Sequence, residues 1–502
     1  MDNNYDIFII GGGINGCGIA RDAAGRGHSV YLCEADDLAS GTSSQSTKLI
    51  HGGLRYLEHY EFRLVREALT EREILWKLAP HIIHPLRFIL PHHKDLRPAW
   101  LLRLGLFLYD HIGGRKKLAT TSTIDLINDK TGKPLRQNYK KGFEYSDCIV
   151  DDARLVLLNA LDAFEHGASI NTRTKCIAMQ RKKSQWLLTV EDQLTKKQSK
   201  ITAKILINAS GPWADKVLTT LNPKKNSQNI RLVQGSHIIV PKIYDHDKCY
   251  IFQNKDNRII FAIPYHEQFT LLGTTDHEYE GDPRKTKITK KEIDYLCTSA
   301  NSYFKNKISP DDIVGTFAGV RSLYNDGTSK AQEVTRDYVL RTDQPNSQSA
   351  PIINIFGGKI TTYRCLAETI LEKIENLLKK ESDKTKGKWT EKAPLPGGKF
   401  AIDDFEKTCK QLKTDYNFLT DKEATRYIKL YGTRTRDFLE DAKSYKDLGE
   451  SFGHGLYQRE VEYQISTEWA VTAEDILWRR TKLGLLFTDA EVIHLTNWLT
   501  SR

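Results

Sequence analysis

The chain has 502 residues, enough for two or three domains, and its 39% of hydrophobic residues can fill a large core. Its 74 Lys and Arg against 64 Asp and Glu leave a formal charge of only +10, and no nucleic-acid-binding module accompanies it, so no nucleic-acid partner is expected. A strand-like N-terminus, no run of about 18 apolar residues and eight scattered cysteines predict a cytoplasmic protein without a membrane-spanning helix, disulfides or a metal site.

Residues 6–34 predict a dinucleotide-binding unit. An apolar run, a glycine turn with the spacing Gly-x-Gly-x-x-Gly, a small-residue helix and a second apolar run follow one another and end at Glu34. Gly11 permits the tight turn, Gly13 lets the backbone approach a pyrophosphate, and Gly16 lets the helix lie close to the strand. The helix N-terminus offers amides and a positive dipole end to phosphates, and Glu34 can bond a ribose hydroxyl. This fingerprint fits NAD and FAD equally well.

Two segments that follow carry polar groups suited to a ligand. The loop at 41–48 is rich in hydroxyl side chains, which can bond phosphates and ribose, although by itself it is typical of an ordinary polar loop. The run at 49–56 places His51, Arg55 and Tyr56 around two adjacent glycines, so that backbone and polar side chains can approach a ring together. Such a grouping, one loop after a cofactor motif, favours a functional role.

Residues 84–117 combine basic side chains with Trp100 and a dense apolar stretch. An amphipathic basic surface of this kind suits an interfacial membrane anchor, because anionic headgroups attract Lys and Arg while apolar side chains enter the lipid boundary. A helix in the domain interior with solvated charges explains the residues equally well. The residues alone leave both interpretations open.

The second half of the chain predicts a second sheet and a second glycine turn. Short β-rich runs between 230 and 275 indicate a mostly antiparallel sheet, and Arg321 and Arg336 lie on strand-like segments after it. Buried arginines need partners, so an anionic substrate is expected for them if no protein acid serves. The apolar strand at 352–356 leads into a glycine turn at 357–359 and a helix, which suits negative charge on a reduced flavin ring.

The remaining segments are less specific. Residues 205–213 predict a buried strand that ends in a small-residue turn, the place where open α/β sheets bind ligands. Residues 379–400 are charged or turn-forming and indicate a linker. The patterns from 401 to 502 are helical and contain no catalytic constellation.

These motifs resemble those of a known family over almost the whole chain. The segments 11–16, 42–44 and 48–58 resemble the FAD-dependent glycerol-3-phosphate dehydrogenases of the bacterial aerobic, respiratory type. Later segments agree, namely 208–213, 273–276, 319–321, 356–364, 395–398 and 477–482. Departures from the family pattern are Ser210, Ser322 and Ile360, where Thr, Pro and Leu are usual, and none of them is a charged position.

The resemblance implies FAD as cofactor and the oxidation of sn-glycerol 3-phosphate to dihydroxyacetone phosphate. A hydride would pass from C2 to flavin N5, and two electrons would then pass to ubiquinone or menaquinone. His51 is the expected base for the C2 hydroxyl, while Arg55 and Lys359 would favour the alkoxide. Tyr56 would orient the substrate, and Arg321 and Arg336 would bind its phosphate. The expected cofactor contacts are Gly11, Gly13, Asn15, Gly16, Glu34, Thr42, Ser43, Ser44, Lys48, Leu49, Ala209, Gly211, Trp213, Gly358, Lys359 and Thr361.

The predicted fold is α/β, or α+β overall. It combines a Rossmann-like FAD-binding domain, an antiparallel β-sheet substrate domain and a helical C-terminal domain. The FAD-binding domain is expected to be discontinuous, and the expected boundaries are 1–80, 150–230 and 350–378 for it, 81–149 and 231–349 for the substrate domain, 379–400 for the linker, and 401–502 for the helices.

A respiratory family favours membrane contact through 84–117, and so a protein bound peripherally to anionic lipid at the cytoplasmic face of the inner membrane. Two alternatives stay open: an oxidase of the same flavin class that uses O2, and a non-catalytic membrane-associated flavoprotein. An NAD-dependent dehydrogenase ranks third, because it does not explain the second glycine turn or the 42–48 loop. The oligomeric state is also open, with a homodimer as one option.

Overall fold

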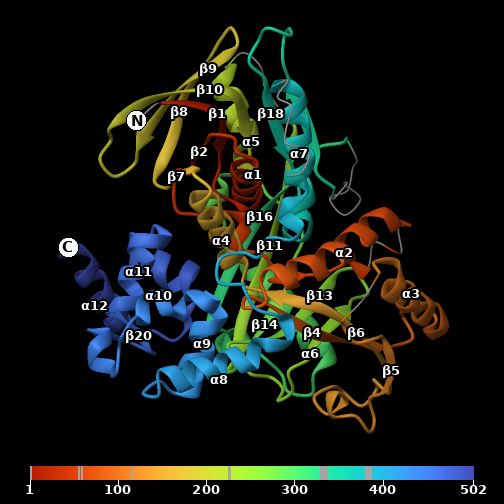
Figure 1. Cartoon of the computed structure of the whole chain (residues 1–502). Helices are drawn as coiled ribbons and strands as arrows, with labels where there is room; N and C mark the ends of the chain where they lie inside the picture. Colours follow the sequence, from red (N-terminus) through yellow and green to blue (C-terminus); the bar gives the residue numbers. More distant parts are fainter. Residues whose placement is uncertain are drawn as a thin grey trace.

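The computed structural model describes residues 3–54, 57, 60–114, 117–223, 228–327, 337–378 and 387–502 (Figure 1). They form two large β-sheets with helices packed against them and a helical unit at the C-terminal end. The predicted class, a mixed α/β fold with a helical C-terminal part, is confirmed. Three predicted site residues, Arg55, Tyr56 and Arg336, lie outside the described residues.

The first sheet is the parallel one that the glycine fingerprint predicts. Its central strand β1 (Asn4–Ile10) pairs in parallel with β2 (Val30–Cys33) and β10 (Gln198–Asn208), and β18 (Ile352–Phe356) pairs in parallel with β10. Helices α1 (Ile14–Gly25), α4 (Asp152–Glu165) and α7 (Tyr363–Leu378) pack together on one face (Figure 1). Because these strands are covered on both faces, they read as nearly continuous apolar runs.

The outer strands complete this sheet. The strand β7 (Ser169–Asn171) extends it beyond β2, and β17 (Val339–Asp343) lies antiparallel to β18. The hairpin of β8 (Thr174–Lys182) and β9 (Gln185–Asp192) pairs with β10 and brings Trp186 into the core of the second face. The short helix α5 (Ala214–Leu221) follows the turn at the end of β10.

The second sheet is mostly antiparallel, as expected. Its order is β15 (His277–Glu278), β11 (Ile230–Pro241), β14 (Phe269–Gly273), β13 (Ile259–Tyr265), β12 (Cys249–Gln253), β4 (Ile83–His92), β6 (Lys141–Val150) and β3 (Leu49–Ile50). In addition, β16 (Gly315–Tyr324) pairs with β11 along ten residue pairs, and β5 (Ser122–Asp125) pairs with β6. Helix α6 (Lys290–Tyr303) covers one face, and α2 (Phe62–Leu78) and α3 (Ala99–Ile112) lie against the other.

The C-terminal unit is built around its own two clusters of buried side chains. Its helices are α8 (Phe405–Asp415), α9 (Asp421–Tyr431), α10 (Arg436–Leu439), α11 (Gln458–Glu468) and α12 (Asp489–Thr500), with a π-helical turn at Asp475–Arg480. A two-stranded ribbon, β19 (Ser451–Gly453) and β20 (Leu456–Tyr457), interrupts the helical pattern. Ahead of the unit, within the segment expected as a linker, Trp389 stacks over Arg21 of α1 and Leu395 is fully buried.

The segment at 84–117 divides into a strand and a helix. The strand β4 is paired with β6 over its whole length and is largely buried. Helix α3 instead exposes Trp100, Leu104 and Phe107, of which 70%, 48% and 50% is accessible. Among the described residues no helix has both the length and the apolar character needed to span a bilayer. Among the described residues, the exposed large apolar side chains of this segment therefore lie on α3.

Candidate active site

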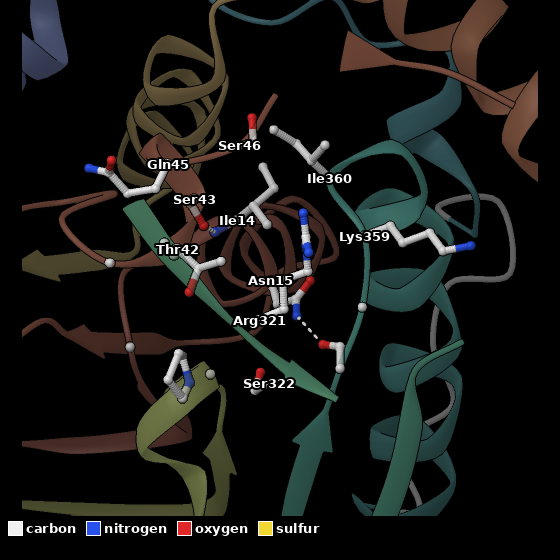
Figure 2. A pocket seen from close by; sticks show the side chains of 18 of the residues that line it. Ile14, Asn15, Thr42, Ser43, Gln45, Ser46, Arg321, Ser322, Lys359 and Ile360 are labelled. Carbon is white, nitrogen blue, oxygen red and sulfur yellow. Dashed lines mark hydrogen bonds between the residues drawn. The ribbon is translucent and has the colours of Figure 1, made fainter. Parts of the chain in front are cut away.

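A cavity of about 840 Å³ lies between the two sheets, where the parallel strands of the first sheet end. Figure 2 shows the arrangement of its lining: the end of helix α1 with Ile14 and Asn15 lies near the centre, the loop at 42–46 lies to its left and above, Lys359 and Ile360 lie to its right, and β16 crosses the view. The carboxyl end of a parallel sheet is where open α/β folds bind their ligands. The position of this cavity therefore agrees with the position of the motifs.

The first glycine turn is shaped for a close approach. Gly11 has φ +112, and a Cβ on it would stand 2.6 Å from the carbonyl oxygen of Ala209. A Cβ on Gly16 would stand 1.9 Å from the carbonyl oxygen of Gly11, so the helix can pack this closely only without a side chain. Helix α1 begins after Gly13, which has no side chain to cap it, and the first amide of the helix, that of Ile14, donates to Ser43 Oγ at 3.0 Å. The amide end of the helix and a hydroxyl group therefore lie together where an anion would bind.

Glu34 lies at the end of β2, and both of its oxygens are bound to the backbone. Its Oε2 accepts a hydrogen bond from the Gly12 amide at 2.7 Å, and its Oε1 accepts one from the Asp36 amide at 2.9 Å. Burial raises the pKa of Glu34, and these two amides act against that rise. The carboxylate is thus fixed in orientation and keeps lone pairs for the hydroxyls of a ribose.

The second glycine turn lies next to the first. Gly357 and Gly358 have φ +77 and +105, and Asn15 Nδ2 donates a hydrogen bond to the Gly357 carbonyl at 3.3 Å (Figure 2). The other amide atom, Asn15 Oδ1, is buried without a hydrogen-bond partner among the described residues. Two helix-opening glycine turns and an unsatisfied acceptor between them fit an extended dinucleotide with a polar ring system.

Arg321 enters the cavity from β16. Its guanidinium donates to the carboxylate of Asp276 and, at 3.3 Å, to Thr274 Oγ1. It lies over Gly235 of the neighbouring strand, where a Cβ would stand 2.8 Å from Arg321 Nη2. The sequence predicted an anionic substrate as the partner of Arg321 only if no protein acid served, and the structure shows that Asp276 is such an acid.

His51 and Lys359 both line the cavity, with geometry that the sequence could not indicate. The Gly53 amide donates to His51 Nδ1 at 3.1 Å, so the neutral ring carries its proton on Nε2. Figure 2 shows the Lys359 side chain directed away from Asn15. The turn Ile360–Thr362 that follows Lys359 contacts α2, and burial raises the pKa of Glu67 on that helix while the positive charge of Lys359 acts against the rise.

Lys48, expected as a cofactor contact, is not among the residues that line the cavity. It has φ +60, and its buried side chain points behind the loop, where Nζ donates to Asp152 Oδ2 at 2.9 Å and to the Ser44 carbonyl at 3.0 Å. Gly16 and Ser44 also stay behind the cavity wall. The predicted residues that do line it are Gly11, Gly13, Asn15, Glu34, Thr42, Ser43, Leu49, His51, Ala209, Gly211, Trp213, Arg321, Gly358, Lys359 and Thr361.

Further lining residues were not predicted. Gln45, Tyr145 and Phe261 belong to the wall, as do Thr274 and Asp276. The last two follow a strand of the second sheet directly, so a polar turn at a strand end was the available signal. Nothing local marks Tyr145 or Phe261, because aromatic residues within strands are usually core residues.

The fold and the cavity together define an oxidoreductase of the flavin dinucleotide class, since a nicotinamide enzyme needs no second glycine turn. The profile of a family described as FAD dependent oxidoreductase matches residues 6–364, and that of the C-terminal domain of alpha-glycerophosphate oxidase matches residues 388–497. The chain therefore belongs to the FAD-dependent oxidoreductase family, and FAD is its cofactor.

Relatives with similar sequences span nearly the whole chain. It is 50% identical to a glycerol-3-phosphate dehydrogenase of Pseudomonas aeruginosa over 99% of this chain and 95% of the relative. It is also 50% identical to a D-erythritol 1-phosphate dehydrogenase of Brucella abortus over 98% of this chain and 97% of the relative. A solved structure, the glycerol-3-phosphate dehydrogenase from Bacillus halodurans complexed with FAD, has a TM-score of 0.78 at 27% identity, with 99% of this chain and 89% of that chain covered.

Proposed function

We propose that the protein oxidises sn-glycerol 3-phosphate to dihydroxyacetone phosphate. The observation that carries the proposal is Arg321, a cation for a phosphate, within the cavity formed by the two glycine turns. FAD, when bound, supplies the two-electron acceptor for the hydrogen on C2. One relative at 50% identity and two more at 49% and 47%, each matched over nearly the full chain, are named glycerol-3-phosphate dehydrogenase, which supports the same substrate.

In this proposal Arg321 binds the substrate phosphate while Asp276 holds its guanidinium in place. A guanidinium has five N–H donors, so Arg321 can keep Asp276 and Thr274 and still offer a fork to phosphate oxygens. Arg336 is proposed as a second phosphate ligand, and Tyr56 as a residue that orients the substrate. Both lie outside the described residues.

His51 is proposed as the residue that takes the C2 hydroxyl proton. In the tautomer favoured by the Gly53 amide, Nε2 carries a proton and donates to a substrate oxygen. To accept the C2 proton at Nε2, the ring must move its own proton to Nδ1 and release the Gly53 amide. Lys359 and Arg55 are proposed to favour the alkoxide, which requires the Lys359 side chain to turn inward from the position in Figure 2.

D-erythritol 1-phosphate is the second candidate substrate, because a relative of that name is as similar as the first. It shares a phosphate and a secondary hydroxyl with glycerol 3-phosphate and carries one carbinol group more. The phosphate-binding role of Arg321 is the same for both substrates. The two substrates would differ only in what they require of the cavity wall beyond the reacting carbon, where D-erythritol 1-phosphate needs space for its additional carbinol group.

We further propose that the electrons pass to a membrane quinone and that α3 contacts lipid at the cytoplasmic face of the inner membrane. Trp100, Leu104 and Phe107 recur at helical spacing and project from one side of α3, and Lys94 and Arg97 are exposed just before it. An apolar stripe next to basic side chains is the pattern of a helix that lies in an anionic interface.

The test is a visible spectrum of the purified protein under anaerobic conditions, taken before and after addition of each phosphate. Bleaching of the flavin by glycerol 3-phosphate, and not by D-erythritol 1-phosphate, is the expected result. The reverse pattern would replace the substrate, and bleaching by neither would refute both proposals. Adding a quinone or O2 to the bleached protein then identifies the acceptor by which of them restores the absorbance.

A further inference from the structure

The C-terminal unit reaches the loops of the cofactor cavity, although none of its described residues lines the cavity. Its π-helical turn Asp475–Arg480 and the following Lys482 are buried against the rest of the protein, and helix α11 packs on α4 (Figure 1). A π-helical turn is rare and is frequently found at functional sites. The contacts of this turn with the rest of the protein therefore indicate which part of the cavity the C-terminal unit affects.

The first contact runs through Asp152, at the start of α4. Its Oδ2 accepts hydrogen bonds from Ser46 Oγ at 2.8 Å and Lys48 Nζ at 2.9 Å, both from the loop at 41–48. On its other side, Lys482 Nζ lies 3.3 Å from Asp152 Oδ1 and donates to Asp151 Oδ1 at 2.7 Å. Two lysines and two aspartates thus form one neutral cluster that joins the cavity loop to the C-terminal unit.

The second contact runs through Asp37, three residues after Glu34. Arg480 Nη2 donates to Asp37 Oδ1 at 2.9 Å, and Arg479 Nε donates to Asp37 Oδ2 at 2.5 Å. Asp37 and Arg480 are each only 1% exposed. Because the adjacent Asp36 amide bonds Glu34, these arginines fix the turn that orients the ribose-facing carboxylate.

Both contacts are ion pairs in the protein interior, and removing one partner leaves an uncompensated buried charge on the other. The two loops are therefore held in one arrangement as long as the C-terminal unit is docked. We propose that the segment Asp475–Lys482 is a positioning element that holds the cavity loops at 34–37 and 41–48 in the geometry that retains FAD, with Lys482 as its central residue.

The test compares two variants of the full chain, Lys482→Met and Arg154→Met. Each removes one buried cation from the boundary between α4 and the C-terminal unit. The Arg154 side chain pairs with Glu468 at 2.6 Å, and among the described residues it forms no hydrogen bond or ion pair with either cavity loop, so its variant is the matched control. The measured quantities are the Kd of FAD for the apoprotein, from flavin fluorescence, and the Tm of each apoprotein.

Lys482→Met is expected to raise the Kd of FAD by at least about fivefold, the lower range of coupling between distinct sites. Arg154→Met is expected to lower the Tm and leave the Kd unchanged. An unchanged Kd in Lys482→Met overturns the proposal, and so does an equal rise in both variants, because the effect would then be general loosening. If Lys482→Met does not fold, Asp151→Asn weakens the same cluster more mildly, and an unchanged Kd in that variant also overturns the proposal.

Discussion

Replacing Gly235 by alanine displaces Arg321 without altering any charge. The Cβ would stand 2.8 Å from Arg321 Nη2 and 2.7 Å from Thr274 Oγ1. The Arg321 atom is the tip of a long flexible side chain and can yield, and the Thr274 hydroxyl can yield by a change of its single χ1 rotamer. Alanine can adopt the strand conformation at this position. The free energy of unfolding should therefore fall by no more than about 1 kcal/mol.

The guanidinium, however, must move by about 0.6 Å to reach an ordinary contact distance of 3.4 Å from the new methyl group. A shift of roughly 1 Å in a positioning contact can cost about a hundredfold in rate. We therefore expect kcat/KM for glycerol 3-phosphate to fall by about tenfold to a hundredfold, or about 1.4–2.7 kcal/mol of transition-state stabilisation. FAD content should not change.

Steady-state turnover with a water-soluble dye as acceptor measures this effect. The control is Gly315→Ala on the partner strand β16, outside the cavity wall, where the Cβ would meet Leu485 at 3.2 Å and turnover should be unaffected. The reasoning is refuted if Gly235→Ala keeps the kcat/KM of the parent protein. It is equally refuted if the substitution still lowers kcat/KM in an Arg321→Met background, since the effect would then not act through Arg321.

Three other changes have defined outcomes. Gly16→Ala puts a Cβ 1.9 Å from the backbone oxygen of Gly11, which cannot yield as a side chain does, so the variant should purify without FAD, as its visible spectrum will show. For Asp152, burial alone would raise the pKa, but Lys48 and Lys482 lower it to about 2, below its unfolded value near 3.9. The ionised carboxylate therefore stabilises the fold above about pH 4. That contribution, roughly 2 kcal/mol, is lost as the pH falls from about 4 to 2, and urea unfolding should show a flatter pH dependence for Asp152→Asn. Exchanging Trp100 and Phe107 for serine should reduce cosedimentation with anionic vesicles while dye-linked turnover stays the same.

The glycine turns could be predicted because their information is local. The steric demand on Gly16 comes from Gly11 in the same turn, and although the demand on Gly11 comes from Ala209 after β10, the motif spacing alone was enough to mark both glycines. The helix that follows and the acid at the end of β2 are likewise within about 20 residues. The order of apolar runs was enough to predict a parallel sheet.

Long-range pairing could not be predicted, because no local pattern says which carboxylate a cation will meet. The acid that holds Arg321 lies 45 residues earlier in the chain, and the one that holds Lys48 lies 104 residues later. Lys48 resembled a cofactor ligand by its place in a polar loop, but its left-handed backbone turns the side chain into the protein. Similarly, 84–117 looked like one surface, yet the pairing of β4 with β6 buries its first part.

The central strands of the first sheet come from residues 4–10, 198–208 and 352–356, and this order has a consequence for biosynthesis. A nascent chain can form β1, α1 and β2 early, but the second glycine turn does not exist until residue 358 has been added. Chains interrupted before that point leave only the last part of β10, Leu206–Asn208, without its partner β18, because residues 198–203 already pair with β9. An unpaired strand edge promotes aggregation. The complete FAD site therefore exists only late in the synthesis of each chain, and we expect FAD supply to limit the yield of folded protein after translation and not during it.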